Sequence, residues 1–358
     1  MPALFLDHIV LKTRSLLERM TSFGLRMFRC STHRTVGLLL LIVSASFVMR
    51  HMFLQAPEDP TSSLRASLIY GARENLSYQQ DIDHAKRQQD RRQRIRDYCK
   101  NSTNNGDIFH QLPNRNHFNF VVSEKYKFII CYVPKTGASQ WKRALINIIA
   151  NRQVKADPDT ISLFDHSLFT FLNRYPPKKR QEMLKSYTTF FFVREPFERL
   201  LSAYRDKFVT YTTSLYAKTG QEIVSKVRKS PKDGTDDDRN LPTFDEFTEY
   251  LDTLPDPSSW DMHWRPSHQT CYPCAIDYDY VGHFETVKED ADYILKQLNL
   301  DKIVEFPSFS GSRTPEHLKT HYSQIPLDRI IRLHERYRPD FDMFGYKYPD
   351  AIKGLFRA

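Results

Sequence analysis

The sequence has few cysteines, no convincing metal-ligand cluster and no internal repeat. Five cysteines in 358 residues are too few for a disulfide-held scaffold, and Cys271-x-x-Cys274 has no second cysteine pair at zinc-site spacing. The chain also lacks the Gly-x-x-x-x-Gly-Lys-Ser/Thr loop with which nucleotide kinases bind a nucleoside triphosphate. We therefore predict no metal, and we disfavour a kinase.

What the chain does have is enough apolar material for one large core, together with a basic charge balance. Hydrophobic residues make up 40% of the sequence and aromatic residues 13%, which favours one large domain with appendages over two equal domains. The net charge of +9 and the pI near 9.1 predict an acidic partner. A polyanionic glycan, a nucleotide, nucleic acid and an anionic membrane all satisfy that prediction.

The longest uncharged apolar stretch, residues 36–49, lies near the N-terminus and is short for a membrane span, which needs about 20 residues. The wider stretch 35–54 adds only Arg50 and His51. A cleaved signal peptide ending near Ala45 is the alternative. Three arginines precede the run, as the positive-inside rule requires of a cytosolic N-terminus: Arg26, Arg29 and Arg34. We predict a cytosolic tail over 1–34 and a signal-anchor transmembrane helix over 35–54.

Residues 55–110 are polar and show little apolar periodicity, so we predict a stem there and a folded domain over 111–358. The basic run 86–96 is typical of a solvated helix. Asn75 and Asn101 begin glycosylation sequons, which have meaning only if this side is luminal. If Cys30 is cytosolic, four cysteines remain for two disulfides whose pairing is not defined by the sequence: Cys99, Cys131, Cys271 and Cys274.

Short apolar runs alternate with helical patterns from about residue 117 onward. The runs 127–133, 188–193 and 278–284 are typical of buried strands, and a helical pattern follows each of them. Pro196 lies at the favoured first turn of the second helix. Thr286 and Glu289 have the spacing of a capping box at the start of the third. This alternation predicts an α/β fold with a mainly parallel sheet flanked by helices.

The turn after the first of these strands has the sequence Lys135-Thr136-Gly137-Ala138-Ser139. Backbone N–H groups in such a turn, together with the dipole of the helix that follows, form an anion site. Lys135 adds a mobile positive charge, and the hydroxyls of Thr136 and Ser139 add hydrogen-bond donors. Taken alone, the segment is equally consistent with an ordinary loop that carries a solvent-exposed lysine.

A second phosphate-binding candidate follows the strand at 188–193. Arg194 comes directly after that strand, and Ser202 lies on the next helix. Ligands of open α/β sheets bind at the carboxyl ends of the strands, where an arginine grips a phosphate through two parallel hydrogen bonds. The alternative is a structural ion pair between Arg194 and Glu195 or Glu198. Two such segments predict a ligand with two separate phosphate groups.

The segments around these two sites resemble the Golgi carbohydrate sulfotransferases. Residues 135–143 resemble the family's 5′-phosphosulfate loop, although the branch commonly has cysteine where this chain has Ala138. Residues 194–202 resemble its 3′-phosphate motif. The likeness is greatest to the chondroitin and dermatan 4-O-sulfotransferases and the glucuronyl 3-O-sulfotransferase. It covers about residues 95–348 and includes the segments 263–274, 280–286 and 337–346.

This resemblance implies a sulfotransferase-like fold and a Golgi membrane enzyme of single-pass type II topology with a luminal catalytic domain. The enzyme would transfer sulfate from 3′-phosphoadenosine-5′-phosphosulfate, without metal or nucleic acid, to a glycan acceptor. We predict the 4-O position of N-acetylgalactosamine in chondroitin or dermatan as the acceptor. Glucuronyl 3-O-sulfation of glycoprotein or glycolipid glycans is the alternative. A glycosaminoglycan-binding membrane protein with an inactive domain is the non-enzymatic alternative.

The resemblance also assigns roles to single residues. It implies that Lys135 neutralises the charge that develops on the bridging oxygen of the leaving group. The acceptor hydroxyl must lose a proton, for which histidine is suited near neutral pH. We predict His166 as this base, with His263 as the alternative. The predicted cofactor-binding residues are Lys135, Thr136, Gly137, Ala138, Ser139, Trp141, Arg194 and Ser202.

Overall fold

A computed structural model describes residues 60–100, 119–150, 168–210, 213–229, 241–308 and 314–357. The chain divides into two compact units, residues 1–76 and 77–358. The predicted tail, the predicted transmembrane segment 35–54 and Asn101 lie outside the described residues, whereas Asn75 lies in helix α3 (Pro60–Lys100). Among the helices that are described, none is long and apolar enough to cross a membrane.

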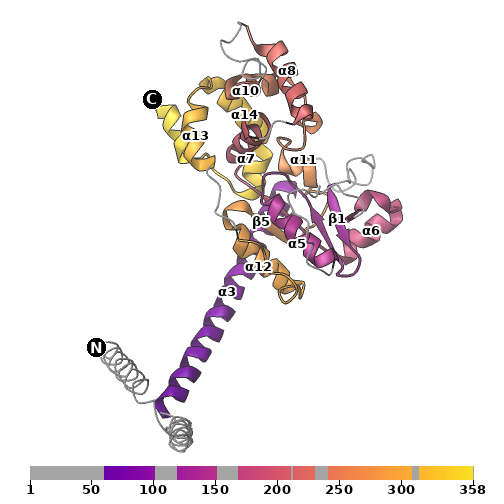
Figure 1. Ribbon diagram of the computed structural model, residues 1–358, viewed down its shortest axis with the longest axis vertical. Coiled ribbons are helices and arrows are strands. Elements are labelled where there is room, and N and C mark those ends of the chain that lie inside the picture. The colour runs from indigo at the N-terminus through magenta and orange to yellow at the C-terminus, as the bar shows by residue number, and fades with distance from the viewer. Residues whose placement is uncertain are drawn as a thin grey trace, which may run out of the picture. The chain divides into compact units, whose positions relative to one another are not determined.

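A five-stranded mixed sheet lies at the centre of the second unit (Figure 1), with the strand order β3-β1-β2-β4-β5. Strands β2, β4 and β5 pair in parallel, whereas β1 is antiparallel to both of its neighbours. The strands are β1 (Phe120–Ser123), β2 (Phe128–Cys131), β3 (Thr170–Phe171), β4 (Thr188–Val193) and β5 (Tyr280–His283).

The predicted α/β fold is confirmed, and the three predicted strands are β2, β4 and β5. The prediction of a mainly parallel sheet needs correction, because two of the four strand pairings are antiparallel. The physical reason is the short connection between β1 and β2. A turn over residues 124–127 allows only an antiparallel return, since a parallel pairing needs a long crossover. The sheet is therefore parallel in its centre and at the β5 edge, and antiparallel toward β3.

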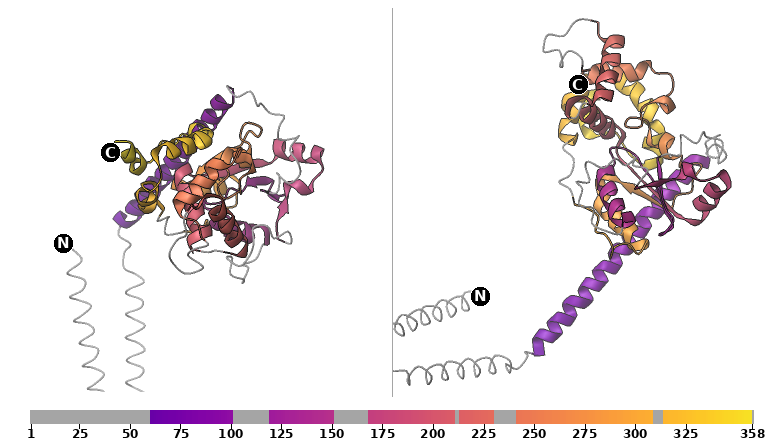
Figure 2. Two further views of the ribbon diagram at one scale, coloured as in Figure 1. Left: turned by 90° about the horizontal axis from the view of Figure 1, so that it is seen from above. Right: turned by 45° about the vertical axis from the view of Figure 1, so that its right-hand side comes forward.

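Helices bury both faces of this sheet (Figures 1 and 2). Helices α5 (Ala138–Ala150) and α12 (Val287–Gln297) cover one face, where their apolar side chains pack with Phe190 and Phe192 of β4. The other face packs against Ile95 of α3, Met183 of α6 (Pro177–Ser186) and Phe344 of α14 (Leu327–Phe344). Because β4 is buried on both faces, its sequence is a nearly continuous apolar run.

A further apolar cluster is built mainly from helices, with Trp260, Trp264 and Ile325 from the segments between them. It joins α14 with α7 (Pro196–Tyr204), α8 (Ser214–Val227), α10 (Phe244–Thr253), α13 (Thr314–Tyr322) and α15 (Asp350–Lys353). The apolar face of α7 points into this cluster, which fixes the helix that follows β4. Shorter elements complete the unit: η2 (Leu172–Arg174), η3 (Arg205–Thr210), η4 (Pro257–Ser259), α11 (Ser267–Cys271), η5 (Phe284–Thr286) and η6 (Gly354–Arg357).

Two disulfides connect distant parts of the second unit. Cys99 at the end of α3 is bonded to Cys274, and Cys131 at the end of β2 is bonded to Cys271 in α11. All four cysteines that were candidates for disulfides are therefore paired. The second disulfide fixes the end of the strand that leads into the Lys135 turn.

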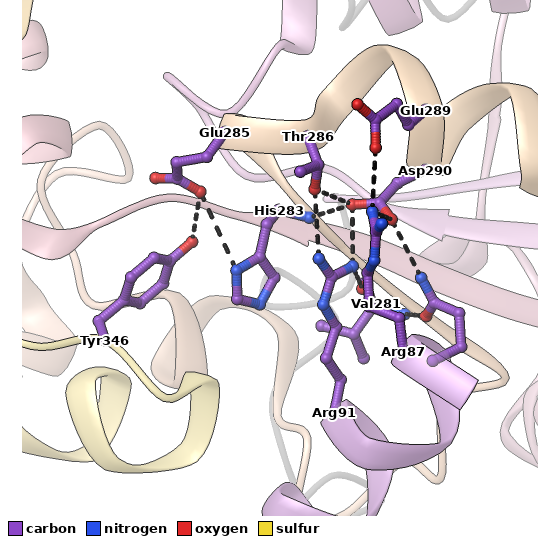
Figure 3. A network of polar contacts seen from close by, with 10 residues as sticks. Arg87, Arg91, Val281, His283, Glu285, Thr286, Glu289, Asp290 and Tyr346 are labelled. Atoms are coloured by element: carbon purple, nitrogen blue, oxygen red, sulfur yellow. Dashed lines mark hydrogen bonds and ion pairs between the residues drawn. The ribbon is translucent and has the colours of Figure 1, made fainter. Parts of the chain in front are cut away.

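The C-terminal half of α3, which lies in the predicted stem, packs against β5 and α12 through buried polar contacts (Figure 3). Asp290 of α12 is fully buried and accepts hydrogen bonds from Arg91 at 2.8 Å and from Gln88 at 3.4 Å. Arg91 also donates to the carbonyl of Val281 in β5 at 2.8 Å. The run 86–96 was predicted to be a solvated helix; it is helical, but one face is buried against the sheet domain.

The same network explains why the predicted capping box at the start of α12 is absent (Figure 3). The hydroxyl of Thr286 donates to Asp290 at 2.6 Å instead of accepting from the helix backbone. Glu289 pairs with Arg87 at 3.1 Å. Both side chains of the predicted box are thus used to hold α3 against α12, a contact that sequence spacing does not encode.

We expect Arg91→Ala to lower the free energy of unfolding by about 3–5 kcal/mol, because the buried Asp290 carboxylate loses its nearest cation and keeps only Arg87, 3.8 Å away. Arg96→Ala is the matched control, since Arg96 pairs with Asp277 at the surface, where the two side chains are 47% and 70% exposed. Such a pair contributes about 0–1 kcal/mol. Urea denaturation with the disulfides intact measures both values. Equal losses in the two variants would contradict the structural importance of Asp290.

Candidate active site

A cavity of about 360 Å³ lies beside the turn that follows β2 and the helix that follows β4. Its lining brings together residues from three of the predicted segments: Lys135, Gly137, Ala138 and Ser139; Arg194 and Ser202; and His263. The first two segments follow the carboxyl ends of neighbouring parallel strands, which is where ligands of α/β sheets bind. The geometry thus brings these residues into one site, whereas Thr136 and Trp141, which were also predicted to bind the cofactor, do not line the cavity.

The turn after β2 has the backbone of an anion cradle. Lys135 and Gly137 have positive φ values of 71° and 86°. A Cβ at position 137 would approach Val287 Cγ2 to 3.0 Å, so the left-handed conformation and the close packing both favour glycine. Thr136 is buried and donates to the Val133 carbonyl at 2.8 Å, which closes the turn.

Helix α5 begins immediately after this turn. The first turn of a helix leaves backbone N–H groups without intrahelical acceptors, and these groups bind anions. The first hydrogen bond of α5 runs from the Trp141 N–H to the Gly137 carbonyl at 3.1 Å, and residues 137–140 line the cavity. A phosphate or sulfate group in the cavity therefore meets the N-terminus of α5. Ala138 lines the cavity at the start of α5, where its backbone N–H can meet an anion without a particular side chain.

Trp141, which was predicted to contact the cofactor, lies in the core. Its side chain is 2% exposed, and its ring packs on Phe190, Phe192 and Phe306 with centroid separations of 5.0–5.2 Å. Trp141 begins the apolar stripe of α5 that packs on the sheet, and its side chain does not line the cavity. The prediction of a direct cofactor contact is thereby corrected to a packing role.

Arg194 joins the two phosphate-binding segments. Its guanidinium lies 4.2 Å over the centroid of the Phe284 ring and contacts the Lys135 carbonyl at 3.4 Å. It also pairs with Glu198 at 3.1 Å, so the predicted alternative of a structural ion pair is present as well. Arg194 and Ser202, which lies further along α7, both line the cavity. The ion pair holds the guanidinium at the cavity wall.

The start of α7 is fixed by Glu195. Its side chain accepts hydrogen bonds from the backbone N–H groups of Phe197 and Glu198 at 3.2 and 2.7 Å, which caps the helix, and Pro196 occupies the first turn as predicted. Burial raises the pKa of Glu195 to about 8, against the effect of these two N–H groups. The cap sets where α7 begins and therefore where Arg194 and Ser202 face the cavity.

Lys135 has an acidic partner that sequence reasoning missed. The π-helical segment η3 continues α7 and carries Asp206 and Lys207 into the cavity. The Asp206 carboxylate lies 3.3 Å from the Lys135 ammonium and 3.1 Å from that of Lys207. Burial lowers the pKa of Lys135, although Asp206 opposes this change. Burial would raise the pKa of Asp206, but the two lysines lower it below its ordinary value.

His263 has the partners of a general base. Its Nδ1 lies 2.6 Å from a carboxylate oxygen of Asp261 and 2.9 Å from the Tyr216 hydroxyl. A carboxylate only accepts hydrogen bonds, so Nδ1 carries the proton and Nε2 keeps a lone pair. Burial lowers the pKa of His263, and Asp261 partly offsets this. The imidazole is therefore neutral near pH 7 and lines the cavity.

The partners of His263 differ in how visible they are in the sequence. Asp261 lies two positions before His263, and its carboxylate accepts from the His263 backbone N–H. This Asp-x-His spacing is a local pattern that could have strengthened the assignment of His263 as the base. Tyr216 comes from α8 and gives no such signal. His166, the preferred base at the sequence level, lies outside the described residues. Within the described part of the chain, no group of three or more His, Cys, Asp or Glu residues is placed to hold a metal ion.

Comparison with known proteins identifies the family. A model described as "Sulfotransferase family" matches residues 118–347. The chain belongs to the sulfotransferase family. The matched region contains the five strands and every residue that lines the cavity, so the protein is a sulfotransferase enzyme.

Several curated relatives of this sulfotransferase are similar over most of its length. Carbohydrate sulfotransferase 11 of Rattus norvegicus is 34% identical over 274 residues, which cover 74% of this chain and 77% of the relative. Carbohydrate sulfotransferase 12 of Xenopus laevis is 31% identical over 76% of this chain and 71% of its own length. Carbohydrate sulfotransferase 14 of Danio rerio is 36% identical over 64% of this chain and 63% of its own length. No solved structure matches the chain.

The family implies 3′-phosphoadenosine-5′-phosphosulfate as the sulfate donor, and the cavity fits this molecule. The glycine turn and the N-terminus of α5 line the cavity with backbone N–H groups, which suits the 5′-phosphosulfate. Arg194 and Ser202, from the segment that follows β4, line the same cavity and suit the 3′-phosphate. Two anion sites in one cavity match a donor with anionic groups at both ends.

We expect Arg194→Lys to weaken binding of adenosine 3′,5′-bisphosphate by roughly 10–150-fold, the equivalent of about 1.5–3 kcal/mol. An ammonium cannot reproduce the planar, paired donors of the guanidinium. Isothermal titration calorimetry measures the dissociation constant. The matched control is Arg338→Lys on α14, where the side chain is 60% exposed. An unchanged dissociation constant in Arg194→Lys would contradict the assignment of the 3′-phosphate site.

Proposed function

We propose that this sulfotransferase transfers sulfate from 3′-phosphoadenosine-5′-phosphosulfate to a sugar hydroxyl, and that the acceptor is the 4-O position of N-acetylgalactosamine in chondroitin or dermatan. The observation that carries the proposal is the cavity in which Lys135, Arg194 and His263 lie together. The names of the relatives support a carbohydrate acceptor. The choice of chondroitin or dermatan is supported by the resemblance of residues 135–143 and 271–274.

The donor-binding residues divide between the two anion sites. The Lys135 turn and the N-terminus of α5 hold the 5′ side, and Arg194 with Ser202 holds the 3′ side. When bound, the donor supplies the sulfuryl group and departs as adenosine 3′,5′-bisphosphate. Lys135 contributes a positive charge at the position where negative charge develops on the departing oxygen. Asp206 retains Lys207 as a partner at 3.1 Å when Lys135 turns toward the anion.

We propose His263 as the group that accepts the proton of the sugar hydroxyl. Its Nε2 receives the proton, while Asp261 holds the ring through Nδ1 and stabilises the imidazolium that forms. The Tyr216 oxygen lies 2.9 Å from the same nitrogen and can accept from its N–H as well. His166 remains the competing prediction, and the two histidines are compared experimentally in the Discussion.

We further propose that the chain is a single-pass type II Golgi membrane protein, anchored by residues 35–54, with its catalytic domain in the lumen. Disulfides form and persist in oxidising compartments, so Cys99–Cys274 and Cys131–Cys271 support a luminal domain. Protease protection of the full-length chain in sealed Golgi vesicles tests this topology. Digestion of the catalytic domain without detergent would contradict it.

The activity is tested with the full-length chain in detergent and radiolabelled sulfate donor. Desulfated chondroitin, dermatan and glucuronyl-terminated glycans serve as acceptors, and the sulfated position is determined by disaccharide analysis. We expect label at the 4-O position of N-acetylgalactosamine. Label on glucuronic acid would instead establish the glucuronyl 3-O activity. Absence of transfer to every acceptor, together with no binding of adenosine 3′,5′-bisphosphate, would overturn the enzyme assignment.

A further inference from the structure

A buried arginine outside the cavity contacts the segments that carry both proposed catalytic groups. Arg199 lies on α7, is 1% exposed and does not line the cavity. Its Nε donates to the carbonyl of Pro134 at 3.0 Å, and its two terminal nitrogens donate to the carbonyls of Arg265 at 2.7 Å and Met262 at 3.0 Å. One side chain thus binds three backbone carbonyls from two separate loops.

The positions of these carbonyls relate directly to catalysis. Pro134 immediately precedes Lys135 in the turn after β2, whereas Met262 and Arg265 lie on either side of His263. Arg199 therefore connects the lysine at the sulfate donor with the histidine at the acceptor.

The chemistry of the guanidinium explains why arginine suits this position. Pro134, Met262 and Arg265 lie outside the helices and strands. Their carbonyls therefore have no regular backbone partner and need hydrogen-bond donors from elsewhere when they are buried. A guanidinium offers five N–H donors in one rigid plane, whereas an ammonium is a compact group that rotates freely. The three bonds to a planar group fix the two loops relative to each other as well as satisfying their carbonyls.

The loop that carries His263 has separate anchors on its far side. Tyr337 of α14 donates to the carbonyl of Trp264, and Asp340 accepts from the backbone N–H groups of Ser267 and His268 at 2.6 and 2.9 Å. These bonds hold the loop to α14 and do not reach the Lys135 turn. Loss of Arg199 is therefore expected to change the separation between the two loops, while the loop around His263 stays bonded to α14.

We propose that Arg199 is a positioning residue that sets the separation between Lys135 and His263, and with it the alignment of donor and acceptor for sulfate transfer. The proposal rests on the proposed function, in which Lys135 and His263 act on opposite ends of the reaction. Misplacement of reacting groups by about 1 Å can lower a rate by roughly 10²-fold. Binding of the donor product does not require the His263 loop, so it is expected to survive.

The test is Arg199→Lys in the full-length chain. We expect kcat, normalised to the sites that bind adenosine 3′,5′-bisphosphate, to fall about 100-fold, with less than a threefold change in the bisphosphate dissociation constant. The matched control is Arg329→Lys. Arg329 is also largely buried and donates to the Asp245 carbonyl at 3.0 Å and to Glu249 at 3.0 Å, between α14 and α10. It is expected to lose thermal stability without losing kcat per binding site.

Tyr337→Phe provides the second comparison, because it removes a bond to the same loop without touching Pro134. We expect its kcat to fall less than tenfold. If Arg199→Lys does not fold, Arg199→Gln takes its place, since a neutral amide introduces no charge to bury and still leaves at least one carbonyl without a donor. The expected loss of kcat is the same.

The outcomes separate this proposal from the proposed function. Wild-type transfer with normal kcat per binding site in the Arg199 variant would overturn the positioning role and leave the function intact. A loss in Tyr337→Phe as large as that in Arg199→Lys would also overturn it, because the bridge to the Lys135 turn would then be irrelevant. Failure of the wild-type enzyme to transfer sulfate would instead overturn the proposed function.

Discussion

Lys135→Ala is expected to lower kcat for sulfate transfer by about 10²–10³-fold, the usual effect of removing one group that stabilises developing negative charge. Lys135 is the first residue of the anion-binding turn, and it lines the cavity. Because the lysine is largely buried, its ammonium interacts more strongly with negative charge in the cavity than it would in water. The alanine variant keeps the glycine turn and the start of α5. Binding of adenosine 3′,5′-bisphosphate is therefore expected to weaken much less than kcat falls.

The stability of this variant separates a catalytic effect from misfolding. Asp206 loses one of its two lysine partners but keeps Lys207 at 3.1 Å, so we expect only a small change in melting temperature. Lys218→Ala on α8 is the control, because Lys218 is an exposed lysine outside the cavity. Transfer assays and calorimetry on both variants measure the effect. Wild-type kcat in Lys135→Ala would refute the role assigned to this lysine.

His263→Gln is expected to lower kcat by about 10²–10⁴-fold, the range for loss of a general base. The wild-type pH profile should carry the signature of this group. The base works when His263 is unprotonated, so kcat/KM falls as the pH decreases through the pKa of His263. Burial lowers that pKa below the ordinary value of 6.5, which moves the acid limb to lower pH. In His263→Gln this limb is expected to disappear.

Two companion variants sharpen the assignment. Asp261 raises the pKa of His263, so Asp261→Asn should shift the acid limb to still lower pH while it reduces kcat, because the ring loses its orienting carboxylate. His166→Gln is the direct competitor. If His166→Gln abolishes transfer and the acid limb while His263→Gln retains both, then His166 is the base and the geometry around His263 has another purpose.

Several elements of the fold were predictable because their signals are local. β2, β4 and β5 are buried strands whose apolar runs stand out in the sequence, and Pro196 marks the start of α7. β1 and β3 were missed, since β3 has only two residues and the apolar run of β1, residues 120–122, is shorter than the runs around β2 and β5. The antiparallel half of the sheet follows from those two strands, and it was therefore missed as well.

The candidate site shows the same division. The Lys135 turn and the segment at Arg194 were predicted because each is a strand followed by a turn and a helix. The spacing of Thr286 and Glu289 and the identity of Trp141 gave misleading local signals. In the folded protein, Thr286 bonds to Asp290, and Trp141 packs against Phe190 in the core. Partners from distant elements decided the role of each.

The sequence by itself determined the segments that bind the donor, because a phosphate cradle is made from neighbouring backbone groups and a few adjacent side chains. Only the tertiary structure decided which groups surround Lys135 and His263. Asp206 of η3, Tyr216 of α8 and Arg199 of α7 reach these two segments from elsewhere in the chain, and no periodicity in the sequence indicates these contacts. The physical reason is that hydrogen bonds and ion pairs act over a few ångströms in space, whereas sequence patterns report only on residues within the same element.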